Sequence, residues 1–284
     1  MSSLKRPWWA GFIFLLAFIP ASVAAQTNCD EGSGPLNRNQ PQGTTPEEVI
    51  QKFAAKEAVF KQARDNYTYT QDVTVQTLDG NTVDGEFKEV TDITYDDKGR
   101  RNENVTYAPQ SSLQRVQMTK EDLDDIRNKM PFVLTTVELP LYDVHYEGTQ
   151  HVDEIDTYVF DVAPKHIEKG SRYFQGRIWV DNHDFQIVKT CGKAVPEIRG
   201  KGNENVFPKF VTYREQVDGQ YWFPTYTRAD DYLRFSGGEV HIRETIKYTN
   251  YKRFGSHSKI IFGGEVSPDK QQPPQQQQQK KPPQ

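Results

Sequence analysis

Residues 173–189, YFQGRIWVDNHDFQIVK, decide the fold of this chain because they have the pattern of two β-strands joined by a polar turn. Residues of the first arm alternate between two faces, which is the period of two expected of a half-buried strand. The face predicted to lie in the core carries Phe174, Gly176, Ile178 and Val180. Residues 181–184, DNHD, have side chains that favour a turn, and the alternation resumes after them. The stretch therefore predicts an antiparallel hairpin.

Similar alternation before and after this hairpin predicts a large antiparallel sheet. Strand patterns begin near Tyr67 and recur around residues 158–162, 211–223 and 240–248, with turn sequences between them. About ten strands are expected, and a sheet of that size must curl, split or be covered by other elements. The predicted fold class is mainly β: a strongly curved antiparallel sheet, forming an incomplete barrel, with covering helices.

Two amphipathic helices are available to cover this sheet. Residues 45–48, TPEE, form a capping box with proline at the first helical position, so they predict a helix that ends near residue 66. A second capping sequence, TKED at 119–122, begins a shorter helix that Pro131 closes. The apolar faces of the two helices carry Phe53 and Phe60, and Leu123 and Ile126.

Composition divides the chain into four segments. Residues 1–25 have the form of a cleavable signal peptide, with a positive start, the apolar run FIFLLAFI and small residues at the end. The apolar run is shorter than the roughly 20 residues of a membrane span, and an uncleaved anchor is the alternative. Residues 26–44 are predicted to be a flexible linker and residues 45–262 the folded domain. Residues 263–284, which end in QQPPQQQQQKKPPQ, are predicted to be a disordered tail. We therefore expect a periplasmic or secreted protein.

The chain has two cysteines, Cys29 and Cys191. An even number of cysteines in an exported protein permits a disulfide between them. Two unpaired thiols, or a cysteine buried for packing, are the alternative. Residues 26–28, QTN, lack the apolar and small residues of a lipobox, so no lipid anchor is expected at Cys29.

Charge and motifs argue against nucleic-acid binding and against familiar catalytic sites. The formal net charge of the chain is −4, whereas phosphate binding requires clustered Lys and Arg. The sequence has no Gly-x-Ser-x-Gly nucleophile elbow, no His-Glu-x-x-His zinc motif and no P-loop. We expect a monomeric protein that is not an enzyme, with no catalytic residues, no metal ion and no cofactor.

One enzymatic alternative remains, a secreted carbohydrate-active enzyme. Such an enzyme needs two facing carboxylates. The candidates are Asp181, Asp184, Glu215, Asp230 and Asp231. Turn chemistry already accounts for Asp181 and Asp184, so the sequence favours a structural role for them.

The pattern as a whole resembles the outer-membrane lipoprotein-sorting proteins of the LolA-like superfamily, in a divergent branch. The resemblance rests on the export signal, the opening helix, the strands from Tyr67, the helix near Leu123 and the hairpin motif YFxGxIWVD followed by FQIVK at 185–189. It implies a curved half-barrel with a helical lid, and a cavity that takes lipid or lipoprotein acyl chains. It also implies transfer of this cargo from an inner-membrane exporter to an outer-membrane acceptor, without covalent chemistry.

A cavity of this kind needs an apolar lining, because burying an acyl chain contributes about 0.8 kcal/mol per CH₂. The residues predicted to line it are Phe53, Phe60, Leu123, Ile126, Ile178 and Val180. Ordinary packed core is the alternative for all six, since solid cores and lined cavities use the same residue types. An envelope scaffold or regulatory protein without a lipid ligand is a further alternative function.

Overall fold

The structure of the protein is a computed structural model that describes residues 27–200 and 203–254. The signal peptide expected over residues 1–25 and the tail expected over residues 263–284 lie outside the described residues. None of the described helices is long and apolar enough to cross a membrane.

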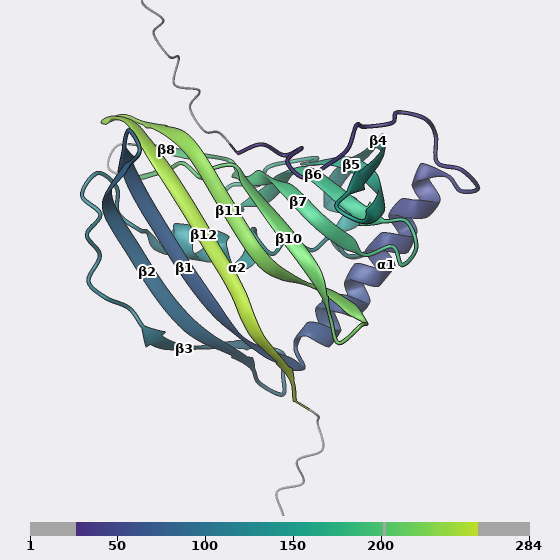
Figure 1. Cartoon of the computed structure of the whole chain (residues 1–284), viewed down its shortest axis with the longest axis horizontal. Helices are drawn as coiled ribbons and strands as arrows, with labels where there is room; N and C mark the ends of the chain where they lie inside the picture. Colours follow the sequence, from purple (N-terminus) through teal and green to yellow (C-terminus); the bar gives the residue numbers. More distant parts are fainter. Residues whose placement is uncertain (1–26, 201–202, 255–284) are drawn as a thin grey trace, which may run out of the picture.

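Within the described residues, ten antiparallel strands form one open, curved sheet, and two α-helices lie against it (Figure 1). The sheet has the strand order β3-β2-β1-β12-β11-β10-β7-β6-β5-β4. The strands are β1 (Tyr67–Asp79), β2 (Thr82–Tyr95), β3 (Arg101–Tyr107), β4 (Tyr142–Val152), β5 (Ile155–Pro164), β6 (Tyr173–Asp181), β7 (Ile187–Val195), β10 (Phe210–Val217), β11 (Tyr221–Phe235) and β12 (Gly238–Arg253). The predicted fold class is therefore confirmed. A short 3₁₀ turn (Leu139–Leu141) and a separate two-stranded sheet of β8 (Ile198–Gly200) and β9 (Asn203–Asn205) complete the described chain.

The last strand, β12, lies inside the sheet, between β1 and β11. This strand therefore pairs with β1, from the first half of the chain, and with β11, from the second half. At its centre Glu244 lies opposite Val75 of β1 on one side and opposite Ala229 of β11 on the other.

The predicted hairpin is present as β6 and β7, which pair from Tyr173 and Val195 onward. Phe174, Ile178 and Val180 face the main core, as the alternation predicts. The outer face differs from the expectation of a half-buried strand, because Trp179 on that face is also fully buried.

The outer face of the hairpin is buried because residues 27–40 lie across it. This N-terminal strap is attached by bridges from Ser33 to β4 and from Asn37 to β4, and by a disulfide between Cys29 and Cys191 of β7. Its composition predicts a linker, but backbone pairing and the disulfide fix it to the sheet.

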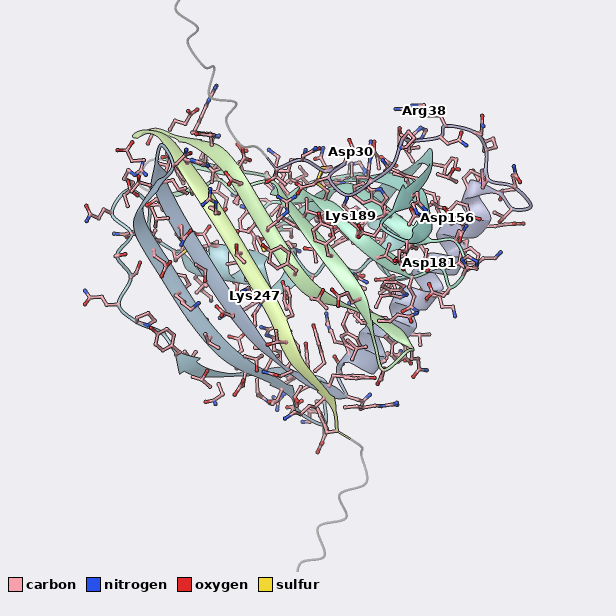
Figure 2. All side chains as sticks on the ribbon, in the orientation of Figure 1. Asp30, Arg38, Asp156, Asp181, Lys189 and Lys247 are labelled. Atoms are coloured by element: carbon pink, nitrogen blue, oxygen red, sulfur yellow. A yellow bond between two sulfur atoms is a disulfide. The ribbon has the colours of Figure 1, made fainter. Side chains whose placement is uncertain are left out.

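Lys189 of β7, labelled in Figure 2, is fully buried and contacts this strap. Its ammonium group donates hydrogen bonds to the carbonyl oxygen of Glu31 at 2.9 Å and to the hydroxyl of Ser33 at 3.0 Å. It also lies over the ring of Trp179, 4.6 Å from its centre. Burial lowers the pKa of Lys189 to about 8.

Helix α1 (Pro46–Arg64) covers one half of the inner face of the sheet (Figure 1). The predicted capping box is present: the Thr45 side chain accepts a hydrogen bond from the Glu48 amide at 3.2 Å. Phe53 packs on Phe160 of β5, and Phe60 packs on Phe223 of β11, with ring centres 5.6 and 5.1 Å apart. The helix therefore spans several strands and binds to them through one apolar face.

Candidate functional site

Helix α2 (Lys120–Asn128) lies on the inner face of the sheet, away from α1, and it positions the candidate site (Figure 1). Its capping box is also present, because Thr119 and Asp122 exchange hydrogen bonds between side chain and backbone. Two polar contacts fix the helix. Asp122 accepts a hydrogen bond from the Asn205 amide group at 2.6 Å, and Asp125 forms an ion pair with Arg172 at 2.6 Å.

An apolar pocket of about 410 Å³ lies between α2, the loop that precedes it, and strands β1, β11 and β12. Ligand pockets for small molecules are roughly 300–1,000 Å³ in volume, so this one is large enough for an organic ligand. Its apolar lining consists of Val75, Val116, Met118, Ile126, Val206, Phe207, Pro208, Leu233, Phe235 and Ile242. The pocket therefore has the lining that an acyl chain requires.

One wall of the pocket carries a carboxyl group, that of Glu244. The residue is 3% exposed, and its Oε1 atom has no hydrogen-bond partner within the described residues. Burial, together with the nearby carboxyl groups of Asp122 and Asp125, raises the pKa of Glu244 to about 8. Near neutral pH the side chain is therefore mostly a neutral acid.

A second pocket, of about 570 Å³, lies on the other side of α2, and its mixed lining includes several charged side chains. Arg101 lines it and donates hydrogen bonds to the Tyr69 hydroxyl at 2.8 Å and to the Gln71 side chain at 2.9 Å. Burial raises the pKa of Asp125, which also lines this pocket, to about 6. Helix α2 therefore lies between the apolar pocket and a second pocket that has several charged side chains.

The structure separates the six residues that the sequence predicts for the cavity. Ile126 lines the apolar pocket. Phe53, Ile178 and Val180 are fully buried in the main core, and Leu123 packs against it while half-buried. Phe60 belongs to a different cluster, with Tyr67 and Phe223.

Sequence reasoning missed Glu244, although the sequence contained a signal for it. Residues 240–248 read VHIRETIKY, and the alternation that identifies this strand puts Val240, Ile242 and Ile246 on the inner face. Glu244 falls on the same face by the same count. An acidic residue in register with core positions marks a site, because burying a carboxyl without a partner is costly.

Three of the five carboxylates of the enzyme alternative, Asp181, Asp184 and Asp230, have local structural partners. Asp181 accepts from the His183 amide at 2.6 Å, and Asp184 from the indole of Trp222 at 2.7 Å. Asp230 contacts the ring of His241 at 2.5 Å. No group of three or more His, Cys, Asp or Glu side chains among residues 27–200 and 203–254 is arranged to hold a metal ion.

Comparison with known proteins gives only weak likenesses. No protein-family model matches the sequence, and no curated protein matches it. Among solved structures, the chain is similar to a DUF1329 family protein from Desulfovibrio piger, with 16% identity, a TM-score of 0.36, and coverage of 72% of this chain and 92% of that chain. It is also similar to a chain of the MucA/MucB complex from Pseudomonas aeruginosa, with 10% identity, a TM-score of 0.22, and coverage of 71% and 100%. A chain of the complex of MucB with MucA(peri) has 9% identity, a TM-score of 0.22, and coverage of 73% and 100%. These values are too low to carry an argument about family or function, and the LolA-like assignment stays a prediction.

Proposed function

We propose that this protein is an exported, non-enzymatic binding protein that holds an acyl chain or similar apolar ligand between α2 and the sheet. The observation that carries this proposal is the pocket of about 410 Å³ with its largely apolar lining. Each CH₂ group buried there would contribute about 0.8 kcal/mol, so a medium-length chain binds without specialised chemistry.

Two further observations support the proposal. The disulfide between Cys29 and Cys191 fits an oxidising compartment outside the cytoplasm, in accord with the expected signal peptide. Three of the carboxylates that a carbohydrate-active enzyme would use, Asp181, Asp184 and Asp230, are held in contacts with neighbouring backbone and side chains. In its finer form, the proposal is that the ligand is a lipid or lipoprotein acyl chain, received from an inner-membrane exporter and passed to an outer-membrane acceptor.

Native mass spectrometry of the protein purified from its own envelope fraction tests this proposal. We expect a near-stoichiometric adduct that organic extraction identifies as a lipid or an acylated peptide. A protein mass without adduct that also takes up no added lipid would contradict the proposal and favour the scaffold alternative.

A pocket-filling variant tests whether the ligand binds in this pocket. Met118 lies in the loop before α2 and is half-buried in the pocket wall, so Met118→Trp should occupy the ligand volume with little strain. Val83→Trp adds the same ring at a position that is 41% exposed and outside the pocket. The first variant should lose the adduct and the second should keep it. Equal occupancy in both variants would place the ligand elsewhere.

A further inference from the structure

Glu244 is the feature of the apolar pocket that an acyl chain alone does not explain. It lines the pocket from the centre of β12, flanked by Ile242 and Ile246 along the strand and by Val75 and Ala229 on the adjacent strands. A carboxyl group in this apolar setting, with Oε1 unpaired among the described residues, destabilises the protein unless a ligand supplies a partner.

The other charged residues around the pocket indicate which ligand group would pair with Glu244. The described charged residues that line it are Arg115, Asp122, Glu204 and Glu244. Arg115 is already paired with Asp84 at 2.7 Å. Among the described lining residues, carboxyl groups therefore outnumber cations.

We propose that the pocket selects an amphiphilic amine, an apolar chain that ends in a protonated ammonium group paired with the carboxylate of Glu244. This inference rests on the proposed function and names its ligand class. The chain fills the apolar volume, and the ammonium group donates hydrogen bonds to the carboxylate.

Other head groups fit this pocket less well. A carboxylate or phosphate head would add a negative charge near Asp122 and Glu204, and near Glu244 once that group has ionised, and like charges in a low-dielectric site repel strongly. A hydroxyl head can form one hydrogen bond with Glu244, but a hydrogen bond between ionised partners is about twice as strong as a neutral one. Breaking a buried ion pair is also costly, so once formed the amine complex is long-lived.

Binding of the amine is expected to depend on pH, because it requires Glu244 to ionise. The charged groups that face Glu244 are Asp122 and Asp125 on α2, with Arg172 paired to Asp125, and the pocket residues Arg115 and Glu204. With the pKa of Glu244 raised to about 8, the free protein must release a proton to bind the amine at pH 6. Affinity for the amine should therefore rise between pH 6 and 8, while affinity for an uncharged alcohol should not.

The experiment is calorimetric titration of the purified full chain with three probes of equal chain length: decylamine, 1-decanol and decanoate. At pH 8 we expect decylamine to bind at least tenfold more tightly than 1-decanol, and decanoate to bind weakest. In Glu244→Gln this tenfold preference should disappear while the affinity for 1-decanol is kept. Glu239→Gln, at an exposed position of the same strand, is the control that should keep the preference.

Each outcome decides between the inference and the function on which it rests. If 1-decanol binds as tightly as decylamine, or if Glu244→Gln keeps the preference, the amine inference is wrong and the apolar-ligand function stands. If none of the probes binds, both fail. Should Glu244→Gln fail to fold, the ratio of the two affinities in the unaltered protein decides: a rise between pH 6 and 8 supports the inference, and a constant ratio contradicts it.

Discussion

Glu244 lies in apolar surroundings that disfavour the ionised form of its carboxyl group, and this affects the free energy of unfolding as well as ligand binding. The pKa of its carboxyl group is about 8 in the folded protein and has an ordinary value of 4.5. The folded state therefore keeps this proton at pH values where the unfolded chain has released it. By linkage, the free energy of unfolding must fall as pH rises between these two values.

We expect Glu244→Gln to remove this dependence. Between pH 6 and 8, the free energy of unfolding of the unaltered protein, measured in urea, should fall by up to about 1.4 kcal/mol per pH unit because of this group. The pH dependence of the variant should be less steep by that amount. Asp125 contributes with the same sign, but its pKa of about 6 places its effect mainly below this range. Parallel pH profiles for the two proteins would show that Glu244 is ionised in the fold.

Gly148 in β4 allows the strap to lie close to the sheet. Its φ is 147°, and a Cβ at this position would collide with the carbonyl oxygen of Asn37. Asn37 and Thr149 exchange two backbone hydrogen bonds of 2.8 Å just beside this point. The strap can therefore lie this close to β4 only because residue 148 is a glycine and has no Cβ atom.

Gly148→Ala should push the strap away from β4 and destabilise the protein by about 1–3 kcal/mol. Hydrogen exchange at the Asn37 and Thr149 amides should accelerate. Gly237→Ala is the control, because a Cβ there meets no atom within 4 Å. Unchanged exchange in Gly148→Ala would show that the strap does not pass this closely.

Helix α1 is fixed to the sheet by a buried ion pair as well as by its apolar face. Glu57 is 0% exposed and lies 3.1 Å from the guanidinium group of Arg214 in β10. It also accepts a hydrogen bond from the Ile187 amide of β7 at 3.2 Å, and Arg214 donates to the carbonyl oxygen of Phe132. One helix residue therefore joins two strands.

Glu57→Ala should cost about 3–5 kcal/mol of unfolding free energy, because it leaves the Arg214 charge buried without its partner. The matched control is Lys61→Ala, one turn further along α1, which removes an exposed pair with Glu138 at 2.9 Å. That change should cost at most about 1 kcal/mol. Urea unfolding of both variants measures the difference, and similar losses would contradict the role given to Glu57.

Local elements of this fold could be predicted from the sequence because their determinants are local. The capping residues Thr45 and Thr119 begin the helices as expected, and alternation gives the hairpin of β6 and β7. The burial of Trp179 and the place of α2 could not be predicted, because they depend on contacts between distant parts of the chain. Of the predicted cavity residues, only Ile126 lines the apolar pocket, since a core position and a pocket position have the same apolar pattern.

At the scale of the whole molecule, the strap covers the outer face of the β6–β7 hairpin, and the disulfide is its covalent attachment to the sheet. Cys29 and Cys191 are separated by 162 residues in the sequence, with Cα atoms 5.5 Å apart. A cross-link over so long a loop restricts the unfolded chain strongly, by about 2–5 kcal/mol in typical proteins.

We expect the double variant Cys29→Ser with Cys191→Ser to fold but to lose about 2–5 kcal/mol of unfolding free energy. Adding a reductant to the unaltered protein should lower its stability by a similar amount and leave the double variant unchanged. A reductant effect on the double variant would show that the loss has another origin.

The same cross-link determines how the molecule would respond to force. At one end of the described segment, the Thr27 amide donates a hydrogen bond to the carbonyl oxygen of Asp230 in β11. At the other end Phe254, which follows β12, donates to the carbonyl oxygen of Asn66. Tension between these ends would pass through the disulfide directly into β7, so α1, α2 and strands β1 to β6 would sit inside a closed loop that carries no extension. At about 3.6 Å per residue, the segment from Thr27 to Phe254 could lengthen to only ~230 Å when oxidised, whereas it could reach ~820 Å when reduced. Reduction of the disulfide would thus increase the extended length of this segment about 3.6-fold.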